Sequence, residues 1–560
     1  MDDTTNLNPP VVVNDLAQAA VALGFTLSSD LLTGSLLRTL VASKPAGEIL
    51  ELGTGVGMGT AQYCSNKKKG EKEDKKAVLL AYLSQEILEE RICLMRASIA
   101  ENGLDDKVCH QIDLGMVQEV IPPGLIEELL DMYQMWEERE QKTNMMGMVY
   151  WLIALHLSPT LSQRRVYGKL VSGLRTWRDD VAEQIPTRSA FSYRREQLGS
   201  ELLQELFVRC AGPRATEQTP GAFWKGMRLL ALDGTVESVP DTQGNRAAFR
   251  YSSDDATSHS PFPQARLLLL VECGTHLICD AELSGCRQAE AYGQALILER
   301  WKLEGSLLLW DSGFHSSKAI FAVRERGGHV IGRLASTSLL TPLYRLADGS
   351  SLAVIYRDQR HRRGEQMLVR IISYRFTDPC IPGAGEQVYR LVTTLVDPFL
   401  YPAKEVAVLY HERWRVEVVI DETRTHLRLS ARTLRSLTPQ GVVQEIYALL
   451  LAHLVVRTLM LTAAQDAGLS PQQLSFTETI HILEETLLPL GLVDATRREA
   501  MVQSIYREIG QQRLPPPRVR IQPRVVKRVR SRYERKKPEH SHAPVLELDV
   551  EFQHIIELVT

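Results

Sequence analysis

The sequence lacks the features that mark several large classes of protein. Its 560 residues include only eight cysteines at irregular spacing, which argues against a secreted framework of disulfide bonds. The first residues, Met-Asp-Asp-Thr-Thr-Asn, are acidic and do not resemble the basic start of a secretory signal peptide. No internal repeat with a period of roughly 20–50 residues is present. We therefore expect a protein of a reducing cytoplasm.

Long apolar runs and an excess of positive charge are also missing. The longest apolar run, Ile446–Val456, is 11 residues long and contains His453, so it predicts a buried helix and no membrane partner. The net charge of −3 creates no global positive field, so a nucleic acid would have to be bound by local patches. The composition, with 44% hydrophobic and 24% charged residues, is typical of a soluble globular protein. At roughly 100–200 residues per domain, a chain of this length makes about three to five units.

The pattern of residues changes along the chain in a way that predicts a mixed α/β core. From about residue 77 to 212 the periodicity is mostly helical. The sequence then predicts five strands, over 227–232, 265–271, 276–283, 306–310 and 328–334, with one helix over 289–300 and another before the last strand. Residues 341–398 alternate in polarity and predict a β-rich insertion, and residues 403–463 return to helical periodicity. The predicted fold class is α/β, with a mixed sheet flanked by helices.

Two carboxylates directly follow predicted strands. Asp233 comes after Leu229–Leu232 and precedes Gly234, and Asp311 comes after a similar apolar run and precedes Ser312-Gly313. A carboxylate at such a strand end is held rigidly with little bulk around it, where hard divalent cations find the oxygen ligands that they prefer. Taken alone, each aspartate is more often an ordinary turn residue, and that alternative stays open.

A third carboxylate, Glu417, lies within a predicted helix. At about 100° per residue, Arg413 lies about 40° from Glu417 around the helix, and Tyr410 and Arg424 each lie about 20° from it. These four residues therefore form one polar stripe. Such a stripe suits an acid that binds a metal ion between guanidinium groups that hold phosphate. Taken alone, such a stripe is more often a surface ion pair, here between Arg413 and Glu417 four residues apart, and that alternative stays open.

Taken in order, several segments resemble a DDE transposase of the insertion-sequence-4 type over residues 94–540. The matching segments are Ile121-Pro-Pro-Gly-Leu-Ile-Glu, Ile185-Pro-Thr-Arg-Ser-Ala-Phe, Arg194-Arg-Glu-Gln-Leu-Gly, Leu232-Asp-Gly-Thr, Trp310-Asp-Ser-Gly-Phe and Leu391-Val-Thr-Thr-Leu-Val-Asp-Pro. The family signature Y-x2-R-x3-E-x6-K is matched by Tyr410, Arg413 and Glu417, and Arg424 stands where lysine is expected. Each motif is weak alone, but their order over most of the chain makes the resemblance strong.

The resemblance implies a ribonuclease-H-like core with a β-rich insertion before the glutamate. It implies that Asp233, Asp311 and Glu417 are catalytic and bind two Mg²⁺ (or Mn²⁺) ions, which activate the nucleophile and stabilise the leaving oxygen. Water would cut the transposon ends, and the freed 3′-hydroxyl would attack target DNA. Tyr410, Arg413 and Arg424 would hold the strand near the cut.

The partners that the resemblance implies are double-stranded DNA, as terminal inverted repeats and as target, and a second copy of the chain. The synaptic complex would be a homodimer, and the protein would be associated with the nucleoid of a bacterial-type cytoplasm. A catalytically inactive relic that still binds DNA is the alternative to an active transposase. A Mg²⁺-dependent cleavage assay separates the two.

A basic segment near the C-terminus is a further candidate for DNA contact. Residues 513–537 contain Arg524, Lys527 and Arg528 among many cations, with Glu534 as the one acid. Their prolines disfavour a continuous helix, and an extended basic arm can follow a phosphate backbone. A tail that only improves solubility is the alternative.

The N-terminal segment resembles a different family. Glu51-Leu-Gly-Thr-Gly-Val-Gly follows a predicted strand, like the cofactor loop of S-adenosylmethionine-dependent methyltransferases. A lysine-rich stretch then replaces the remaining strands of such a domain, so we expect a truncated piece with no cofactor bound. A methyltransferase is therefore the least favoured function. The domains that we expect are a methyltransferase-like segment (1–63), a charged linker (64–93), a helical N-terminal transposase domain (94–212), the catalytic core in two parts (213–340 and 399–465), a β-rich insertion between them (341–398), and a C-terminal helical region with a basic tail (466–560).

Overall fold

A computed structural model of the chain describes most of the region that resembles the transposase family. The described residues are 116–136, 144–171, 185–253, 260–335, 338, 340–360, 362–375, 388–428, 433–490 and 495–515. Apart from Arg375 and Val388, they belong to one compact unit. The methyltransferase-like segment, the linker, and Arg524, Lys527 and Arg528 lie outside the described residues, and the predictions about them stay predictions.

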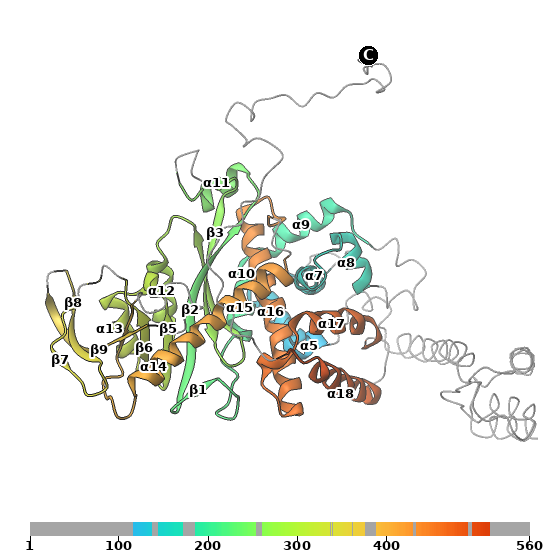
Figure 1. Cartoon of the computed structure of the whole chain (residues 1–560). Coiled ribbons are helices and arrows are strands. Elements are labelled where there is room, and N and C mark those ends of the chain that lie inside the picture. The colour runs from blue at the N-terminus through green and yellow to red at the C-terminus, as the bar shows by residue number, and fades with distance from the viewer. Residues whose placement is uncertain are drawn as a thin grey trace, which may run out of the picture. The chain divides into compact units, whose positions relative to one another are not determined.

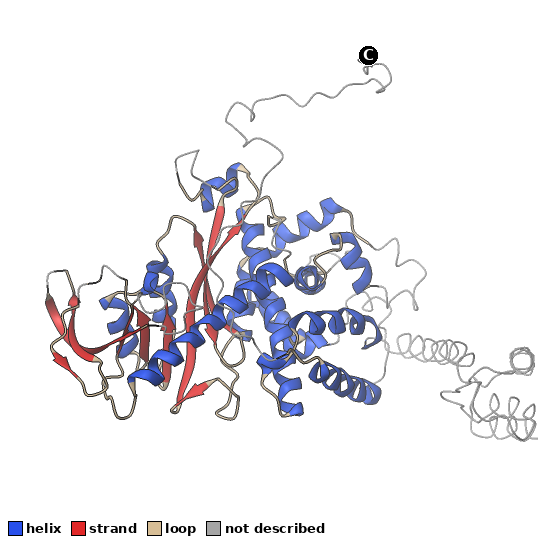
Figure 2. Ribbon diagram, in the orientation of Figure 1, coloured by secondary structure: helices blue, strands red, loops and turns tan. Residues whose placement is uncertain are grey.

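A ten-stranded mixed sheet forms the centre of this unit. Its first part has the order β4-β3-β2-β5-β6, in which β2, β3 and β4 are antiparallel while β5 and β6 run parallel to β2 (Figures 1 and 2). The bounds are β1 Phe223–Trp224, β2 Met227–Ser238, β3 Gln264–Glu272, β4 Ile278–Gly285, β5 Ser306–Trp310 and β6 His329–Arg333. The predicted fold class, a mixed ribonuclease-H-like sheet flanked by helices, is confirmed.

The predicted β-rich insertion continues this sheet instead of forming a separate layer. Strand β10 pairs antiparallel with β6, with Leu391 opposite Arg333, and β9, β8 and β7 follow in that order. The bounds are β7 Tyr344–Arg345, β8 Ser351–Asp358, β9 Arg363–Tyr374 and β10 Tyr389–Thr393. The insertion therefore shares backbone hydrogen bonds with the core.

Two strands differ from their predicted bounds. Strand β2 does not end at Leu232 but runs on to Ser238, because its antiparallel pairing with β3 continues to Gln264 after the parallel partner β5 has ended. Strand β4 begins at Ile278, because His276 takes a left-handed backbone conformation (φ 62°) in the β3–β4 turn. Asp233 therefore lies inside β2, at the point where the neighbouring strand β5 ends.

The alternation of side chains along β2 separates the two faces of the sheet. Leu229 and Ala231 pack into the larger core with the C-terminal helices, whereas Leu230 and Leu232 pack into a smaller core with α12 (Glu290–Arg300) and α13 (Ser317–Glu325). Because successive side chains of a strand point to opposite faces, Asp233 belongs to the face of the larger core. The same alternation in β5 places Asp311 on that face.

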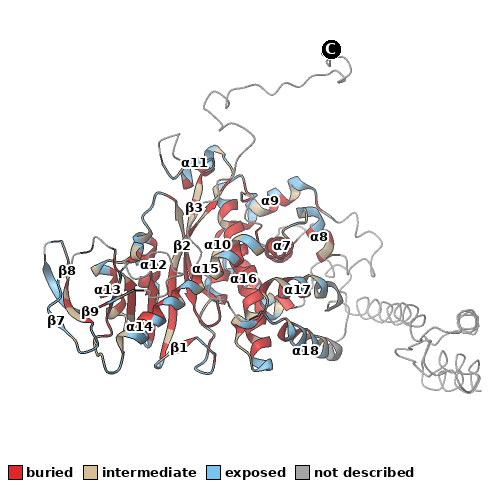
Figure 3. Ribbon diagram, in the orientation of Figure 1, coloured by how far each residue is buried: buried red, intermediate tan, exposed pale blue. Residues whose placement is uncertain are grey.

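Helices from both ends of the described chain pack around one buried helix, α16 (Pro439–Ala467). Thr438 caps its N-terminus by accepting a hydrogen bond from the Gly441 amide, and Gly468 ends it in the left-handed conformation (φ 64°). By length and composition alone α16 could cross a membrane, but 89% of its most apolar window is buried in the protein (Figure 3). The buried helix predicted around Ile446–Val456 is therefore confirmed.

The remaining helices are distributed around the sheet and α16. Three of those at the N-terminal side have side-chain caps, for example Asn144, whose side chain accepts from the Gly147 amide at 2.7 Å. Their bounds, and those of the other helices, are α5 Met116–Val120, α6 Pro123–Met132, α7 Met145–Leu157, α8 Gln163–Leu170, α9 Arg188–Leu198, α10 Glu201–Cys210, α11 Gln243–Phe249, η5 Ser312–Phe314, α14 Ala403–Tyr410, η6 His411–Trp414, α15 Arg415–Asp421, η7 Glu422–His426, η8 Pro471–Gln473, α17 Phe476–Leu490 and α18 Ala495–Gln511.

Candidate active site

The two aspartates emerge side by side from neighbouring parallel strands. Leu232 of β2 is opposite Trp310 of β5, so Asp233 and Asp311 are the next residues of strands that lie about 4.8 Å apart. Each carboxylate is anchored to the backbone that follows it. The Gly234 amide donates to Asp233 Oδ1 at 2.8 Å, and the Ser312 amide donates to Asp311 Oδ1 at 2.7 Å.

The glycines that follow the aspartates make room on the opposite face of the sheet. A Cβ atom added at Gly234 would lie 3.4 Å from Glu290 Oε1, and one added at Gly313 would lie 3.4 Å from Glu290 Oε2. Glu290, the first residue of α12, forms an ion pair with Arg266 of β3. The Glu290 carboxylate therefore lies beside a glycine that follows each aspartate. The sequence gives no sign of this contact, because it depends on how α12 packs against the sheet.

The third acid, Glu417, is linked to Asp233 by the side chain of Arg413. The guanidinium Nη1 of Arg413 lies 2.7 Å from Asp233 Oδ2, and its Nη2 lies 3.7 Å from Glu417 Oε1. The Arg413 side chain is 10% exposed and that of Glu417 is 39% exposed, so the carboxylate of Glu417 borders the solvent. Figure 1 shows α14 and α15 crossing the sheet, and α15 packs against β2.

The charges of this cluster act on one another. Burial raises the pKa of Asp233, and the negative charges of Glu417 and Asp311 raise it further, while the Gly234 amide and Arg413 act in the opposite direction. Burial opposes the charge on Arg413, but Tyr410 and the three acids outweigh it and raise its pKa. The Arg413 guanidinium therefore contacts Asp233 and Glu417, and the charge of Asp311 also acts on it. The structure thus brings together the three predicted acids and two residues of the predicted stripe.

Tyr410 anchors the end of α14 to the end of β5. Its hydroxyl donates to the carbonyl oxygen of Trp310 at 3.3 Å, directly before Asp311. The side chain is buried, and burial raises the pKa of its phenol. Tyr410 therefore holds the helical segment against the strand that carries the second aspartate.

The fourth residue of the predicted stripe lies farther along β2. Arg424 Nη1 donates to Thr235 Oγ1 at 3.5 Å, and its Nε lies 3.6 Å from Glu237 Oε1. The predicted regular helix is wrong here: a 3₁₀ turn, η6, precedes α15 and a π-helical turn, η7, follows it. Because Arg424 lies within the π turn, the regular spacing of 100° per residue that predicted its position does not hold for this segment.

The acids do not surround a common point as metal ligands would. Within the described part of the chain, no three His, Cys, Asp or Glu side chains lie close enough to hold one metal ion. The cation between Asp233 and Glu417 is the guanidinium of Arg413. The site as described is thus a cluster of three acids partly neutralised by an internal arginine.

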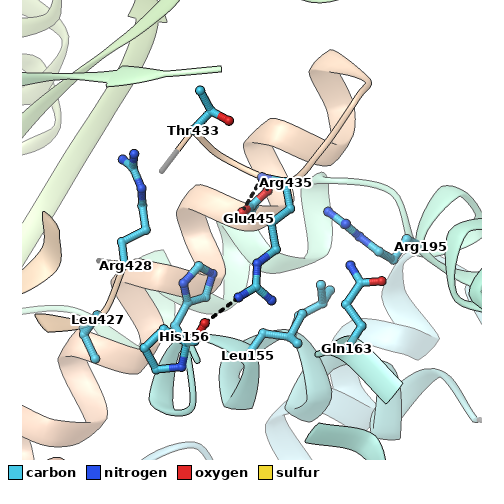
Figure 4. A pocket seen from close by; sticks show the side chains of 11 residues that line it. Leu155, His156, Gln163, Arg195, Leu427, Arg428, Thr433, Arg435 and Glu445 are labelled. Carbon is cyan, nitrogen blue, oxygen red and sulfur yellow. Dashed lines mark hydrogen bonds between the residues drawn. The ribbon is translucent and has the colours of Figure 1, made fainter. Parts of the chain in front are cut away.

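A pocket lies apart from these acids, between the N-terminal helices and the residues that precede α16 (Figure 4). Arg195, Arg428 and Arg435 line it together with His156, and burial followed by the charges of these arginines lowers the pKa of His156 to about 3. Arg195 donates to the carbonyl of Gly441 and Arg435 to that of Pro159, each at 2.9 Å. These arginines therefore join the helical region to the core.

Comparison with known proteins gives matches along the same region. The family model "Transposase DDE domain" matches residues 224–455, and the model "Insertion element 4 transposase N-terminal" matches residues 111–208. The chain is 29% identical over 343 residues to "Transposase InsG for insertion sequence element IS4" of Escherichia coli (strain K12), which covers 60% of this chain and 76% of that protein. It is 25% identical over 193 residues to "Putative transposase InsZ" of the same organism, which covers 34% of this chain and 64% of that protein.

A solved structure of a piggyBac transposase synaptic complex with hairpin DNA is also similar, with a TM-score of 0.37 and 11% identity over 72% of this chain and 85% of that one. Both family models begin after the glycine-rich segment at 51–57, so its resemblance to methyltransferases stays a prediction. Together the two models cover more than half of the chain, and Asp233, Asp311 and Glu417 lie within the first of them. The chain belongs to the DDE transposases, with an N-terminal region of the insertion-element-4 type.

Proposed function

We propose that this transposase cuts and rejoins DNA by metal-dependent phosphoryl transfer at Asp233, Asp311 and Glu417. The observation that carries the proposal is that Asp233 and Asp311 follow paired residues of β2 and β5, while Arg413 joins Asp233 to Glu417 of α15. The cut-and-paste reaction would begin with hydrolysis at the transposon ends. Strand transfer to target DNA by the freed 3′-hydroxyl would follow.

The donor set fits a hard divalent cation. All three side chains offer carboxylate oxygens, which Mg²⁺ and Mn²⁺ prefer. Burial and, to a smaller extent, the charges of Glu417 and Asp311 raise the pKa of Asp233, and a cation beside it would favour its charged form. Asp233, Asp311 and Glu417 would hold the ions, which supply an activated nucleophile and stabilise the leaving oxygen.

The arginines of the site are suited to binding the DNA strand that is cut. A guanidinium fork matches two oxygens of a phosphate, as it matches those of a carboxylate. When Asp233 and Glu417 hold a metal ion, Arg413 is free to pair with the phosphate at the cut. Arg424 is 41% exposed and lies farther along β2, so it can contact the same strand beyond the cut. Tyr410 would orient the segment through its bond to Trp310.

The substrates follow from the chemistry proposed. Double-stranded DNA would bind as terminal inverted repeats and as target, and the basic segment that contains Arg524, Lys527 and Arg528 would add contacts to its backbone. One active site serves one transposon end at a time, so we propose a homodimer that joins two ends. Such a protein would work at the nucleoid.

The test is cleavage of a duplex that carries the terminal inverted repeat of the encoding element. We expect cleavage with Mg²⁺ or Mn²⁺, and its loss in Asp233→Ala while the variant still binds the duplex. A wild-type protein that binds the duplex but never cuts it under these conditions would contradict the proposal and indicate an inactive relic.

A further inference from the structure

A buried ionic cluster joins the catalytic segment to the central helix. Glu422, the first residue of η7, accepts from Arg457 Nε at 2.9 Å and forms a second bond with Nη2 of the same guanidinium. His453 Nε2 lies 3.0 Å from Glu422 Oε2, and Arg457 Nη2 lies 2.9 Å from His276 Nδ1. The cluster therefore connects η7, α16 and the turn between β3 and β4.

All four side chains of this cluster are withdrawn from solvent. Their exposures are Glu422 4%, Arg457 3%, His453 0% and His276 3%. Burial and then Arg457 lower the pKa of His276 to about 4, and burial lowers that of His453, so both imidazoles are neutral at pH 7. Burial opposes the ionisation of Glu422, but Arg457 and the two histidines hold its pKa well below the usual value. The cluster is thus one ion pair with two neutral rings.

Such a pair is a poor means of stabilising a protein core. Desolvation of both charges offsets most of their attraction, and apolar residues of similar volume often replace a buried pair without loss of stability. Three atoms of the cluster, His276 Nε2, His453 Nδ1 and Arg457 Nη1, also find no hydrogen-bond partner among the described residues. What the bidentate pair does supply is a defined geometry.

The Glu422–Arg457 pair lies where the segment that carries Glu417 changes from the α-helix α15 to the π turn η7. The Leu427 amide donates to the carbonyl of Glu422 at 3.0 Å, which closes the wider i→i+5 turn of η7. The hydroxyl of the buried Thr423 donates to the carbonyl of Ile420 at 2.9 Å, so that this carbonyl has a hydrogen-bond donor within the π turn. Glu422 lies five residues after Glu417 and two before Arg424.

The register of this segment decides which residues face β2. With η7 in place, Glu417 and Arg413 act at Asp233, while Arg424 reaches Thr235 and Glu237. We propose that Glu422 and Arg457, with His453 and His276, are positioning residues that fix η7 and so hold Glu417 and Arg424 in register with Asp233. This inference rests on the proposed function, since it assigns the cluster a part in the same reaction.

The test removes both charges together. The double variant Glu422→Gln with Arg457→Met leaves no buried charge without its partner. We therefore expect its unfolding midpoint to be close to that of the wild type and above that of Arg457→Met alone. At saturating DNA we expect the cleavage rate constant to fall on the order of 100-fold with KM nearly unchanged, because small displacements of catalytic groups cost about this much. A purely structural cluster would leave this double variant as fast as the wild type, which would overturn the proposal.

The control is the Asp280–Arg300 pair, 3.1 Å apart at the edge strand β4, whose other side-chain partners are Glu282 and Trp301. We expect Asp280→Leu with Arg300→Met to cleave at the wild-type rate. If the first double variant fails to fold, Arg457→Lys replaces it, because it keeps the charge and loses the fork. A wild-type rate in Arg457→Lys would then contradict the proposal.

Hydrogen exchange separates this inference from the proposed function. We expect the amides of residues 415–427 to exchange faster in the double variant while those of the sheet are unchanged. If the wild type does not cleave DNA, the proposed function fails, and exchange alone decides the inference. Unaltered exchange over 415–427 would overturn it.

Discussion

Arg413 bridges Asp233 and Glu417, with its guanidinium 2.7 Å from the first carboxylate and 3.7 Å from the second. A cation that belongs to the protein therefore lies between two acids that we assign to metal binding. This relationship makes Arg413 and the metal ion alternative partners of Asp233. It leads to predictions about stability as well as about activity.

Replacing Arg413 should make folding more dependent on metal. In Arg413→Gln the acids lose their only close cation among the described residues, and we expect the free energy of unfolding without metal to fall by about 2 kcal/mol. Mn²⁺ should then stabilise the variant more than it stabilises the wild type, as measured by urea unfolding. Arg357→Gln, which breaks exposed pairs with Glu325 and Glu365, is the control and should change little. An equal response of Arg413→Gln and wild type to Mn²⁺ would contradict the prediction.

The free energy of unfolding of the metal-free protein should depend on pH in a way that reflects the raised pKa of Asp233. Its pKa is raised above the ordinary 3.8 by burial and by the neighbouring acids. The folded state therefore binds this proton more tightly than the unfolded state, and stability is lost as the pH rises through the raised pKa. We expect Asp233→Asn to be more stable than wild type at pH 8, with the difference shrinking as the pH falls toward 3.8. A difference that stays constant from pH 8 down to pH 3.8 in urea unfolding would argue against this assignment.

Gly332 should tolerate no side chain. A Cβ atom there would lie 2.3 Å from Nε1 of Trp310, the residue before Asp311. We expect Gly332→Ala to lower the free energy of unfolding by about 1–3 kcal/mol and to slow DNA cleavage by the folded protein, since Trp310 must move. Gly124→Ala in α6 is the matched control, because nothing lies within 4 Å of its new Cβ and alanine favours a helix. Cleavage at the wild-type rate by Gly332→Ala would show that Asp311 does not depend on this packing.

Arg424 should contribute to DNA binding without contributing to stability. It is 41% exposed, and its contacts to Thr235 and Glu237 are long, at 3.5 and 3.6 Å. We expect Arg424→Ala to weaken binding of a duplex and to reduce the slope of log affinity against log salt by about 1, the effect of one lost phosphate contact. Fluorescence anisotropy over a salt series measures this, with Arg357→Ala as the control. An unchanged salt slope would remove Arg424 from the DNA contacts.

The core strands and the two aspartates could be predicted because local patterns decide them. Apolar runs bounded by glycine gave β5 with its observed bounds, and the parallel order of β2 and β5 then brings Asp233 and Asp311 together. The end of β2 could not be predicted in the same way. It depends on β3, a partner whose pairing extends beyond that of β5.

The catalytic helix shows where periodicity fails. Tyr410, Arg413 and Glu417 fall within one short stretch, and the structure brings them to the aspartates as expected. Arg424 lies within η7, whose first residue, Glu422, is joined to Arg457 on another helix, and no local pattern reports that contact. Glu290 was missed for the same reason, since only packing places it beside Gly234 and Gly313.

Binding of Mn²⁺ to the metal-free protein tests the shared cation site most directly. Electron paramagnetic resonance would measure free Mn²⁺ during titration of the wild type and of Asp233→Ala, Asp311→Ala and Glu417→Ala. If the three acids hold the same ions, each substitution should weaken binding by about tenfold or more, which is 1.4 kcal/mol or more. Wild-type affinity in any one of the three variants would contradict a site built from all three carboxylates.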